Sequence, residues 1–373
     1  MLIRISQDTL LSALGTVHRA VSSTSPVPAL TGILLTATDN KLRLVASDSE
    51  ISIEHSVEAS VESEGGIILP ARYFLDIVRK LPSGQDVRIA CDQANWTATI
   101  TWGRSQFVVH GTEPGQFPSI AFDSGSEAIN LSQPRLREMI RRTVFAVAQN
   151  ESRPILTGQL LEIAPSEIRL VSIDGVRLAY CKNEIEQEGL EPQKAVIPGR
   201  AMNELARLLS GDQASSCLIS VSDNQAFCHL GATRFVSRLL EGQFPPYEQI
   251  IPAKFRTAIT LDTEHFHDAC ERASLLSADN DKTIRIEAQD DLLVVTSNTP
   301  EVGKVREEME CSVEGDPLEI AFNARFLIEG LRSIDADKIR FEANGPFSPC
   351  CIRPIDHENN IYVAMPLRTL GDA

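Results

Sequence analysis

The sequence contains no long apolar segment and no paired cysteines. No stretch approaches 18 consecutive apolar residues, and the first residues, MLIRISQDTLL, lack the apolar core of a signal peptide. The eight cysteines are scattered without a CxxC spacing, which is typical of small core residues in a reducing compartment rather than of a disulfide framework. We therefore expect a cytoplasmic protein that does not insert into a membrane.

Motifs of catalysis are missing as well. There is no GxxxxGK[ST] phosphate loop, no GxGxxG after a strand, no HExxH and no GxSxG. His265 and His267 stand two apart on a predicted helix, so they point to different faces and cannot share a metal there. The run Asp279-Asn280-Asp281 lacks the glycine of a calcium loop and indicates a turn. We expect no enzymatic activity, no catalytic residue, no metal and no cofactor.

One sequence pattern is repeated along the chain. The segment PALTGILLTA at 28–37 returns as PILTGQLLEI at 154–163, an offset of 126 residues. A second block, ILPARYFLDIVRKL, ends at Leu81 and returns as VIPGRAMNELARLL, ending at Leu209, and as AFNARFLIEGLRSI, ending at Ile334. GRSQF, which starts at 103, returns as GATRF at 231. A repeat of this length is a whole domain with its own core.

The repeat predicts three similar domains, at 1–126, 127–255 and 256–373. A hydrophobic fraction of 43% is ample for separate cores. Apolar residues recur at helical spacing in the first helix of each copy, expected at 7–21, 133–148 and 263–276. A second, shorter helix begins behind a Pro or Asn in each copy, at 71–81, 198–209 and 323–334. Alternating β-runs with short turns fill the rest, so we predict an α+β fold of antiparallel sheets with helices on one face.

Two aspartates recur at one position of the repeat. Asp48 follows LRLVAS and Asp174 follows IRLVSI, whereas Asn298 takes this position in the third copy. Because the two carboxylates belong to separate domains, they would lie too far apart to form an acid–base couple. A repeated turn or cap is the preferred interpretation.

Positive charge is concentrated in the predicted helices. The chain has a net charge of −16, which opposes indiscriminate nucleic-acid binding, yet the six helices sum to +5 and the remaining chain to −21. Arg72 and Arg79 lie one heptad apart, opposite the apolar stripe of their helix, and Arg135 and Arg142 repeat that spacing. Ordinary solvated helix faces would explain this pattern. The functional alternative is a basic helical surface that binds a phosphate backbone without reading bases.

Over essentially its whole length the sequence resembles the bacterial sliding clamps, the β subunits of the replicative DNA polymerase III. The resemblance is carried by the three copies in register, LPARYFLDIVRKLP, RPILTG followed by DGVRLA, EGQFPPY, and the terminal YVAMPLR. It implies three tandem DNA-clamp domains per chain and a head-to-tail homodimeric ring. Sheets form the outside of such a ring, and the helices line a pore for duplex DNA.

The resemblance also implies partners and a function without catalysis. A closed ring cannot fall off the duplex, so a polymerase tethered to it stays at the primer end. The expected partners are double-stranded DNA without sequence preference, a second copy of the chain, the clamp loader, replicative and translesion polymerases, and other proteins with clamp-binding motifs. During replication the protein would associate with the nucleoid.

Some DNA-contacting positions of the family are matched and others differ. Arg72 matches a family arginine, whereas Thr24 stands where an arginine is common. Asn150 replaces a frequent glutamine, and Pro154 and Ile155 replace a pair of aromatic contacts. Four arginines of the predicted helices are further candidates for the pore: Arg137, Arg141, Arg142 and Arg200.

The family's peptide-binding groove is matched more fully. The resemblance places in it Leu156, Ile173, Gly175, Val176, Arg177, Leu178, Pro245, Gln249, Ile250, Val363, Met365, Pro366, Leu367 and Arg368. Val176 stands at a frequent histidine position and Gln249 at a frequent arginine position. We expect Arg177 and Arg368 at the rim, and the tail 369–373 beside the groove. The alternative is that MPLR is only a last core strand and tail.

The ring is expected to close through an apolar seam between the first domain of one chain and the third domain of the other. The resemblance assigns to it Phe107, Leu275 and Leu276; alternatively, the two leucines fill their own domain's core. For the whole protein, the alternative function is a paralogous clamp-like scaffold that binds peptides but encircles DNA poorly or not at all.

Overall fold

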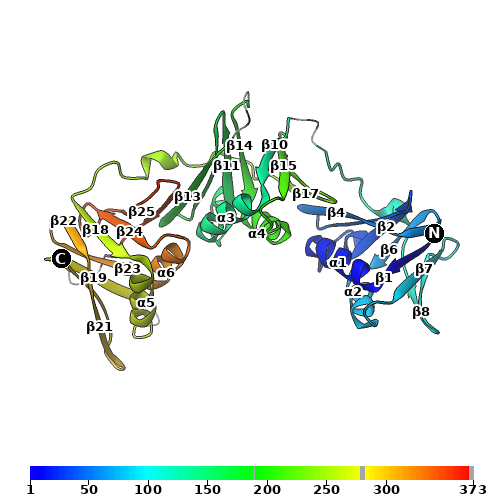
Figure 1. The fold of residues 1–373 in the computed structure, drawn as a ribbon, viewed down its shortest axis with the longest axis horizontal. Coiled ribbons are helices and arrows are strands. Elements are labelled where there is room, and N and C mark those ends of the chain that lie inside the picture. The colour runs from blue at the N-terminus through cyan, green and yellow to red at the C-terminus, as the bar shows by residue number, and fades with distance from the viewer. Residues whose placement is uncertain are drawn as a thin grey trace. The chain divides into compact units, whose positions relative to one another are not determined.

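The chain folds into two compact units, which are described separately. The computed structural model describes residues 1–123, 125, 127–150, 152–185, 187, 190–277 and 282–368. Unit 1 comprises Met1–Leu136 and Glu204–Leu239, and unit 2 comprises Arg137–Asn203 and Leu240–Ala373. Helices α3 (Gln133–Thr143) and α4 (Gly199–Leu208), both labelled in Figure 1, each contain residues of both units.

Unit 1 contains two antiparallel sheets and helices α1 (Gln7–Val17) and α2 (Ala71–Lys80), which contact each other. The five-stranded sheet has the order β5 (Ser60–Ser63), β1 (Leu2–Ser6), β7 (Asp86–Asp92), β8 (Thr97–Trp102), β9 (Ser105–His110). The eight-stranded sheet has the order β10 (Ile129–Ser132), β15 (Ser216–Val221), β16 (Gln225–Leu230), β17 (Thr233–Arg238), β4 (Ile51–Glu58), β3 (Lys41–Ser47), β2 (Gly32–Thr38), β6 (Gly65–Pro70). Helix α1 packs on β3 and β4, and α2 packs on β2 and β6.

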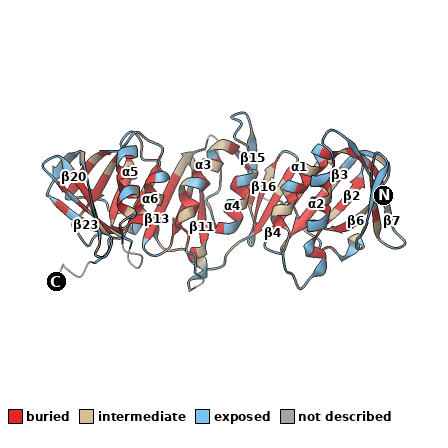
Figure 2. Cartoon of the chain, turned by 90° about the horizontal axis from the view of Figure 1, so that it is seen from below, coloured by how far each residue is buried: buried red, intermediate tan, exposed pale blue. Residues whose placement is uncertain are grey.

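Unit 2 repeats this arrangement with helices α5 (Thr263–Ser274) and α6 (Ala324–Arg332) in mutual contact. Its nine-stranded sheet has the order β14 (Gln193–Pro198), β11 (Gly158–Ala164), β12 (Glu167–Ile173), β13 (Arg177–Glu184), β26 (Asn360–Ala364), β25 (Cys350–Pro354), β24 (Lys338–Ala343), β18 (Thr257–Asp262), β22 (Ser312–Gly315). The four-stranded sheet has the order β21 (Gly303–Glu310), β20 (Leu292–Thr299), β19 (Thr283–Gln289), β23 (Leu318–Asn323). Figure 2 shows buried residues along the strands and a mixture of buried and exposed residues on the helices.

Each large sheet combines strands from two copies of the sequence repeat. In unit 1, β17 of the second copy pairs with β4 of the first, with Phe235 opposite Ile53. In unit 2, β26 of the third copy pairs with β13 of the second, with Tyr362 opposite Ala179. The last strand of one copy therefore joins the edge strand of the preceding copy by continuous antiparallel hydrogen bonding. The prediction of antiparallel sheets from three copies of an α+β domain is confirmed.

The glycine of PALTG and PILTG has a steric role that both copies share. The segments Pro28–Thr31 and Pro154–Thr157 each form a short 3₁₀ turn that leads into a strand. A Cβ at Gly32 would lie 2.5 Å from Ile68 Cγ2, and one at Gly158 would lie 2.6 Å from Val196 Cγ1. Because the neighbouring strand passes this close, a residue with a side chain cannot occupy either position without displacing it.

The first helices are shorter than the sequence predicts. Helix α1 ends at Val17 rather than residue 21, and His18–Ala20 form a 3₁₀ turn. Helix α3 ends at Thr143 rather than residue 148, since Thr143 leaves the helical conformation (φ −131°) and Val144–Ala146 form a 3₁₀ turn. The apolar periodicity continues through these tighter turns, so it does not mark where the α-helix stops.

The cysteines behave as core residues. All eight are free, six of them are buried, and Cys270 and Cys350 have no exposed surface. Burial raises the pKa of both of these thiols. The prediction that cysteine serves here as a small core residue is confirmed.

Candidate functional site

An apolar cluster in unit 2 collects most of the predicted groove residues. Its buried members include Leu156, Ile173, Leu178 and Val363, and Ile250 packs against it as a half-buried residue. We call it the β13–β26 cluster, because these two paired strands supply its centre. It draws together segments that lie up to about 200 residues apart in the sequence.

Other predicted groove residues lie at the surface of the same unit. Val176 and Met365 are 43% and 40% exposed, and the Met365 N–H donates to the Val176 carbonyl over 2.8 Å. The segment after β26 is held to the four-stranded sheet, because the Leu367 N–H donates to the Ala321 carbonyl over 2.7 Å. Gly175 and Gln249 are exposed, and Pro245, Pro366 and Leu367 are half-buried. Arg368 is exposed and lies over the Phe347 ring at 5.8 Å. The predicted tail 369–373 lies outside the described residues.

Arg177 was predicted at the rim of the groove, and this prediction is wrong. The residue is buried, with 5% of its surface exposed. Its guanidinium donates to Asp174 Oδ2 over 2.8 Å, to the Phe145 carbonyl over 2.9 Å and to Glu329. The Phe326 ring lies 4.5 Å from its centre. Burial lowers the pKa of this group, but the bond to Glu329 and the other negative partners outweigh burial and raise it. Arg177 thus connects β13 to α6 from a buried position, because both carboxylates and the Phe145 carbonyl accept hydrogen bonds from its guanidinium.

The repeated aspartates shape repeated turns. Asp48 Oδ1 accepts hydrogen bonds from the backbone N–H groups of Glu50 and Ile51, and Asp174 Oδ1 accepts from those of Val176 and Arg177. The bonds span 2.8–3.0 Å in both copies. The prediction of a repeated turn is confirmed, and in the second copy the same aspartate also orients Arg177.

The candidate DNA-binding residues differ in how available they are. In unit 1, Arg72 and Thr24 are exposed. In unit 2, Arg141, Arg200, Asn150 and Pro154 are exposed and Arg137 is half-buried. Arg142 pairs with Glu138 and, at 3.4 Å, with Asp335, and only 15% of its side chain is exposed. Its positive charge is therefore neutralised within unit 2, which contradicts its assignment as an open phosphate contact.

Ile155 also departs from its predicted role. It is half-buried and packs against the β13–β26 cluster. Its side chain lies 3.7 Å from the position that a Cβ of Gly242 would take, so it packs beside the segment after β17. An aliphatic residue at this position is used for packing, whereas Asn150 and Pro154, the other two predicted DNA contacts in this segment, are exposed.

The predicted seam residues are exposed on their own units. Phe107 on β9 is 43% exposed and stacks on Trp102 with ring centroids 5.3 Å apart. Leu275 is 80% exposed, directly after α5, and Leu276 is half-buried. The alternative that Leu275 fills its own domain's core is wrong. An apolar side chain this exposed is available for contact with another surface.

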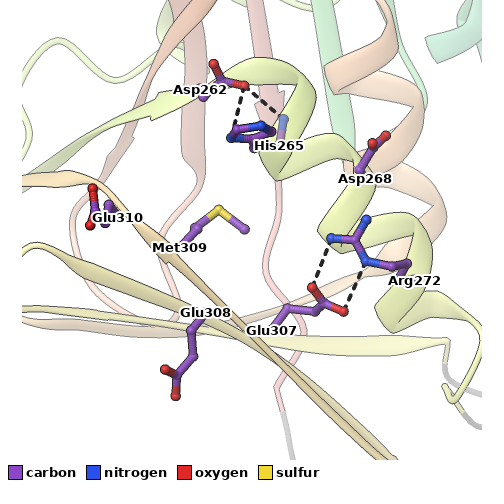
Figure 3. A pocket seen from close by; sticks show the side chains of 8 residues that line it. All are labelled: Asp262, His265, Asp268, Arg272, Glu307, Glu308, Met309 and Glu310. Atoms are coloured by element: carbon purple, nitrogen blue, oxygen red, sulfur yellow. Dashed lines mark hydrogen bonds and ion pairs between the residues drawn. The ribbon is translucent and has the colours of Figure 1, made fainter.

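A pocket of about 460 Å³ lies between α5 and β21 in unit 2 (Figure 3). Its lining is acidic: Asp262, His265, Asp268, Arg272, Glu307, Glu308, Met309 and Glu310. Arg272 is bound to Glu307 by two hydrogen bonds of 3.1 and 2.9 Å, which lower the pKa of that carboxyl. With five carboxylates against one arginine and one histidine, the pocket disfavours phosphate groups.

The two histidines of α5 point to different faces, as the sequence predicts. His265 is exposed, whereas His267 is largely buried beside Asp268 and Glu271. One ligand atom from each of these last three residues lies within 4.8 Å of the other two. However, Glu271 already accepts a 2.7 Å hydrogen bond from Arg332. The predicted turn at Asp279-Asn280-Asp281 lies outside the described residues.

Comparison with known proteins places this architecture in the class of DNA clamps. Sequence models of the N-terminal, central and C-terminal domains of the DNA polymerase III beta subunit match residues 1–121, 130–246 and 248–368. The chain is 34% identical over 375 residues to the beta sliding clamp of Staphylococcus aureus, covering 98% of both chains. It therefore belongs to the DNA polymerase III beta subunit family, the bacterial beta sliding clamps, and its function is that of a DNA sliding clamp.

Solved structures agree with this assignment. The DNA polymerase sliding clamp of Bacillus subtilis superposes with a TM-score of 0.96 at 32% identity, over 99% of both chains. The sliding clamp of Pseudomonas aeruginosa bound to griselimycin superposes with a TM-score of 0.94 at 29% identity, over 99% of this chain and 100% of that one. These comparisons give the alternative of a paralogous scaffold no support. Among the described residues, no helix is long and apolar enough to cross a membrane.

Proposed function

We propose that two copies of this chain close head to tail into a ring around duplex DNA, and that the ring carries no catalytic activity of its own. The observation that carries the proposal is a junction used twice within the chain. The last strand of copy two, β17, pairs with β4 of copy one, and the last strand of copy three, β26, pairs with β13 of copy two. We propose that these junctions connect three domains, at 1–126, 127–255 and 256–373.

A third junction of the same kind is left open among the residues that the structure describes. The last strand of copy one is β9, which lies at the edge of the five-stranded sheet. In copy three, the strand that corresponds to β4 and β13 is β21, which lies at the edge of the four-stranded sheet. An open sheet edge is a template for pairing with another chain. If β9 of one chain pairs with β21 of another, both edges disappear and the assembly closes after two chains.

The repeat predicts the register of this pairing. Phe107 occupies the position of Phe235, which faces Ile53 across the first junction. Thr296 of the third copy corresponds to Ala46 of the first. Thr296 pairs with Arg306 in the hairpin of β20 and β21, just as Ala46 pairs with Ile53 in the hairpin of β3 and β4. Phe107 of one chain is therefore expected opposite Arg306 of the other, with Val108 opposite Val305.

The same equivalence predicts a side-chain contact at the ring seam. In the second junction Arg177 lies against Phe326 and Glu329 of α6. The corresponding residues in the sequence blocks are Tyr73 and Asp76 on α2, and Lys304 takes the place of Arg177 on β21. Tyr73 is 67% exposed in the single chain. We expect it to cover Lys304 of the second copy, with Asp76 as the counter-charge and Leu275 nearby.

The exposed arginines of the helices are proposed to face the DNA. The family resemblance supports Arg72, and exposure supports Arg141 and Arg200, with the half-buried Arg137 beside them, Asn150 as a neutral donor and Thr24 and Pro154 as weaker neighbours. A few arginines give a weak, sequence-blind contact that slides, while the closed ring prevents loss.

The surface of the β13–β26 cluster is proposed to bind short peptides from the clamp loader, from replicative and translesion polymerases, and from other partners with clamp-binding motifs. Val176, Met365 and Ile250 offer apolar contacts over a buried floor of Leu156, Leu178 and Val363. Met adapts to different side chains because it is unbranched. Griselimycin, which is bound to the Pseudomonas aeruginosa clamp, is a candidate competitor for this surface.

Two measurements test the proposal. Sedimentation equilibrium should give twice the 40.9 kDa of one chain at micromolar concentration. In cells the protein should be cytoplasmic and gather on the nucleoid during replication. A chain that remains a monomer at these concentrations, with α2 and β21 intact, would argue against the ring.

A further inference from the structure

The segment that joins the second and third copies is held in place by one tyrosine. Residues 241–256 contain no strand, and Tyr247 is the one buried residue among them, with 3% of its surface exposed. Its ring belongs to the β13–β26 cluster and packs beside the Tyr180 ring, with centroids 5.9 Å apart. Four other apolar residues of the segment are half-buried and pack against the cluster: Phe244, Ile250, Ile251 and Phe255.

The hydroxyl of Tyr247 is hydrogen-bonded to a network of charged side chains on the sheet. It donates a short hydrogen bond to Oε2 of Glu162 on β11, a carboxylate that is 4% exposed. Lys194 and, at 3.6 Å, Arg169 neutralise this carboxylate, and Arg169 also donates to the Tyr247 oxygen over 3.4 Å. A hydrogen bond to a partly desolvated, charged acceptor is stronger and more directional than a neutral one.

The backbone around Tyr247 presents three residues of the proposed peptide surface. Tyr247–Gln249 form a 3₁₀ turn, in which the Ile250 N–H donates to the Tyr247 carbonyl over 3.0 Å and the Gln249 N–H donates to the Pro246 carbonyl over 3.2 Å. Gln249 is exposed and Ile250 half-buried, and Pro245 lies two residues before the tyrosine. Tyr247 supplies side-chain hydrogen bonds between this turn and the sheet, while Ile250 adds apolar contact with the cluster, so we expect the orientation of the turn to depend largely on the tyrosine.

We propose that Tyr247 is a positioning residue for peptide binding: its hydrogen bond to Glu162 fixes the turn that presents Pro245, Gln249 and Ile250 to the peptide. This inference rests on the proposed peptide surface. It assigns to Glu162, Lys194 and Arg169 a supporting role that acts through Tyr247 rather than through contact with the peptide. Without the bond the ring still packs, but the turn rotates more freely and must be ordered when the peptide binds.

The test measures the affinity of a fluorescein-labelled decapeptide with one leucine and one phenylalanine anchor, using the full-length dimer. Tyr247→Phe should weaken binding about tenfold, the size expected from one hydrogen bond to a charged group. The melting temperature should change little, and hydrogen exchange should accelerate only within 245–251. Tyr180→Phe is the matched control, because it removes a hydroxyl from the same cluster but no bond to Glu162, and it should bind as the unmodified chain does.

A second pair of variants separates the hydrogen bond from packing. Glu162→Gln keeps an acceptor for the hydroxyl and should retain affinity within about twofold, whereas Glu162→Leu should reproduce the loss seen with Tyr247→Phe. Unchanged affinity in both Tyr247→Phe and Glu162→Leu would overturn the positioning role. The surface itself is checked with Val176→Asp combined with Met365→Asp. If that double variant also binds normally, the peptide surface is wrong and the positioning role falls with it.

Discussion

The carboxylate of Glu329 on α6 pairs with two arginines, Arg177 and Arg325, that differ in burial. The Arg177 side chain is 3% exposed and comes from β13, 152 residues away, whereas that of Arg325 is 61% exposed and lies one helical turn away. One pair ties the second sequence copy to the third within unit 2. The other is an exposed pair on the surface of α6.

This difference predicts unequal effects on stability. Arg177→Met should lower the free energy of unfolding by about 3 kcal/mol, because it leaves Asp174 and Glu329 without their buried partner. Arg325→Met removes only an exposed pair and should cost less than about 1 kcal/mol. Chemical denaturation of both variants, followed by a probe in unit 2, measures the two values. Equal losses would show that burial does not set the strength of this junction.

Acid should weaken unit 2 through the same carboxylate. Burial raises the pKa of Glu329, but the hydrogen bonds from Arg177 and Arg325 outweigh it and hold the pKa below its ordinary value. The unfolded chain therefore takes up the proton first, near pH 4.3, and the stabilisation is lost as the pH falls below that value through the folded pKa. Glu162 shifts in the same direction because its bonds to Lys194 and Tyr247 overcome burial.

The measurement is the denaturation midpoint between pH 7 and pH 3. Glu329→Gln should be less stable than the unmodified chain at pH 7 and should lose less stability on acidification. Glu58→Gln, a change at an exposed carboxylate of unit 1, serves as the control. Parallel curves for Glu329→Gln and the unmodified chain would remove Glu329 from the acid response.

The seam prediction can be tested by breaking the ring without unfolding the chain. Leu275→Lys, or Tyr73→Ala combined with Asp76→Ala, should give a folded monomer at micromolar concentration, because each variant alters an exposed side chain of the proposed interface. Ile355→Lys, a change at a 52% exposed residue after β25 and outside the proposed interface, is a matched surface control. If the Leu275 variant and the Tyr73/Asp76 variant both sediment as dimers, the interface lies elsewhere.

The helical arginines should govern the salt dependence of residence on circular DNA. Arg72→Glu and Arg141→Glu should each shorten residence, and each lost phosphate contact should reduce the slope of log affinity against log salt by about one. Arg285→Glu, a charge reversal on β19, is the matched control on a strand. If this control shortens residence as much as the helix variants do, net charge rather than a helical surface controls binding.

The sequence predicts the repeated parts of the fold better than the contacts between them. The apolar spacing of Phe74 and Val78 locates α2, and both residues are fully buried. The burial of Arg177 could not be predicted, because its partner Glu329 is distant in sequence and the motif shows only a polar residue before a strand. Strand β21 carries little apolar signal in the sequence, because its half-buried and exposed positions alternate among charged residues such as Glu307 and Glu308.

The candidate site shows the same division. The resemblance names the groove residues, and the β13–β26 cluster brings Leu156, Leu178 and Val363 together. Tyr247 and Glu162 were not singled out, since a tyrosine in a proline-rich linker and a glutamate in a strand carry no motif. The aromatic and aliphatic residues of the linker, Phe244, Tyr247 and Ile250 among them, are the signal that could have pointed to an anchor.

The central claim, a closed ring on DNA, is tested most directly by topology. The clamp is loaded by its clamp loader onto a nicked circular plasmid, purified by gel filtration, and the plasmid is then cut once with a restriction enzyme. The ring should remain on the circle and leave within minutes of linearisation, because only an end releases it. Equal retention on circular and linear DNA, or equal loss from both, would contradict the account.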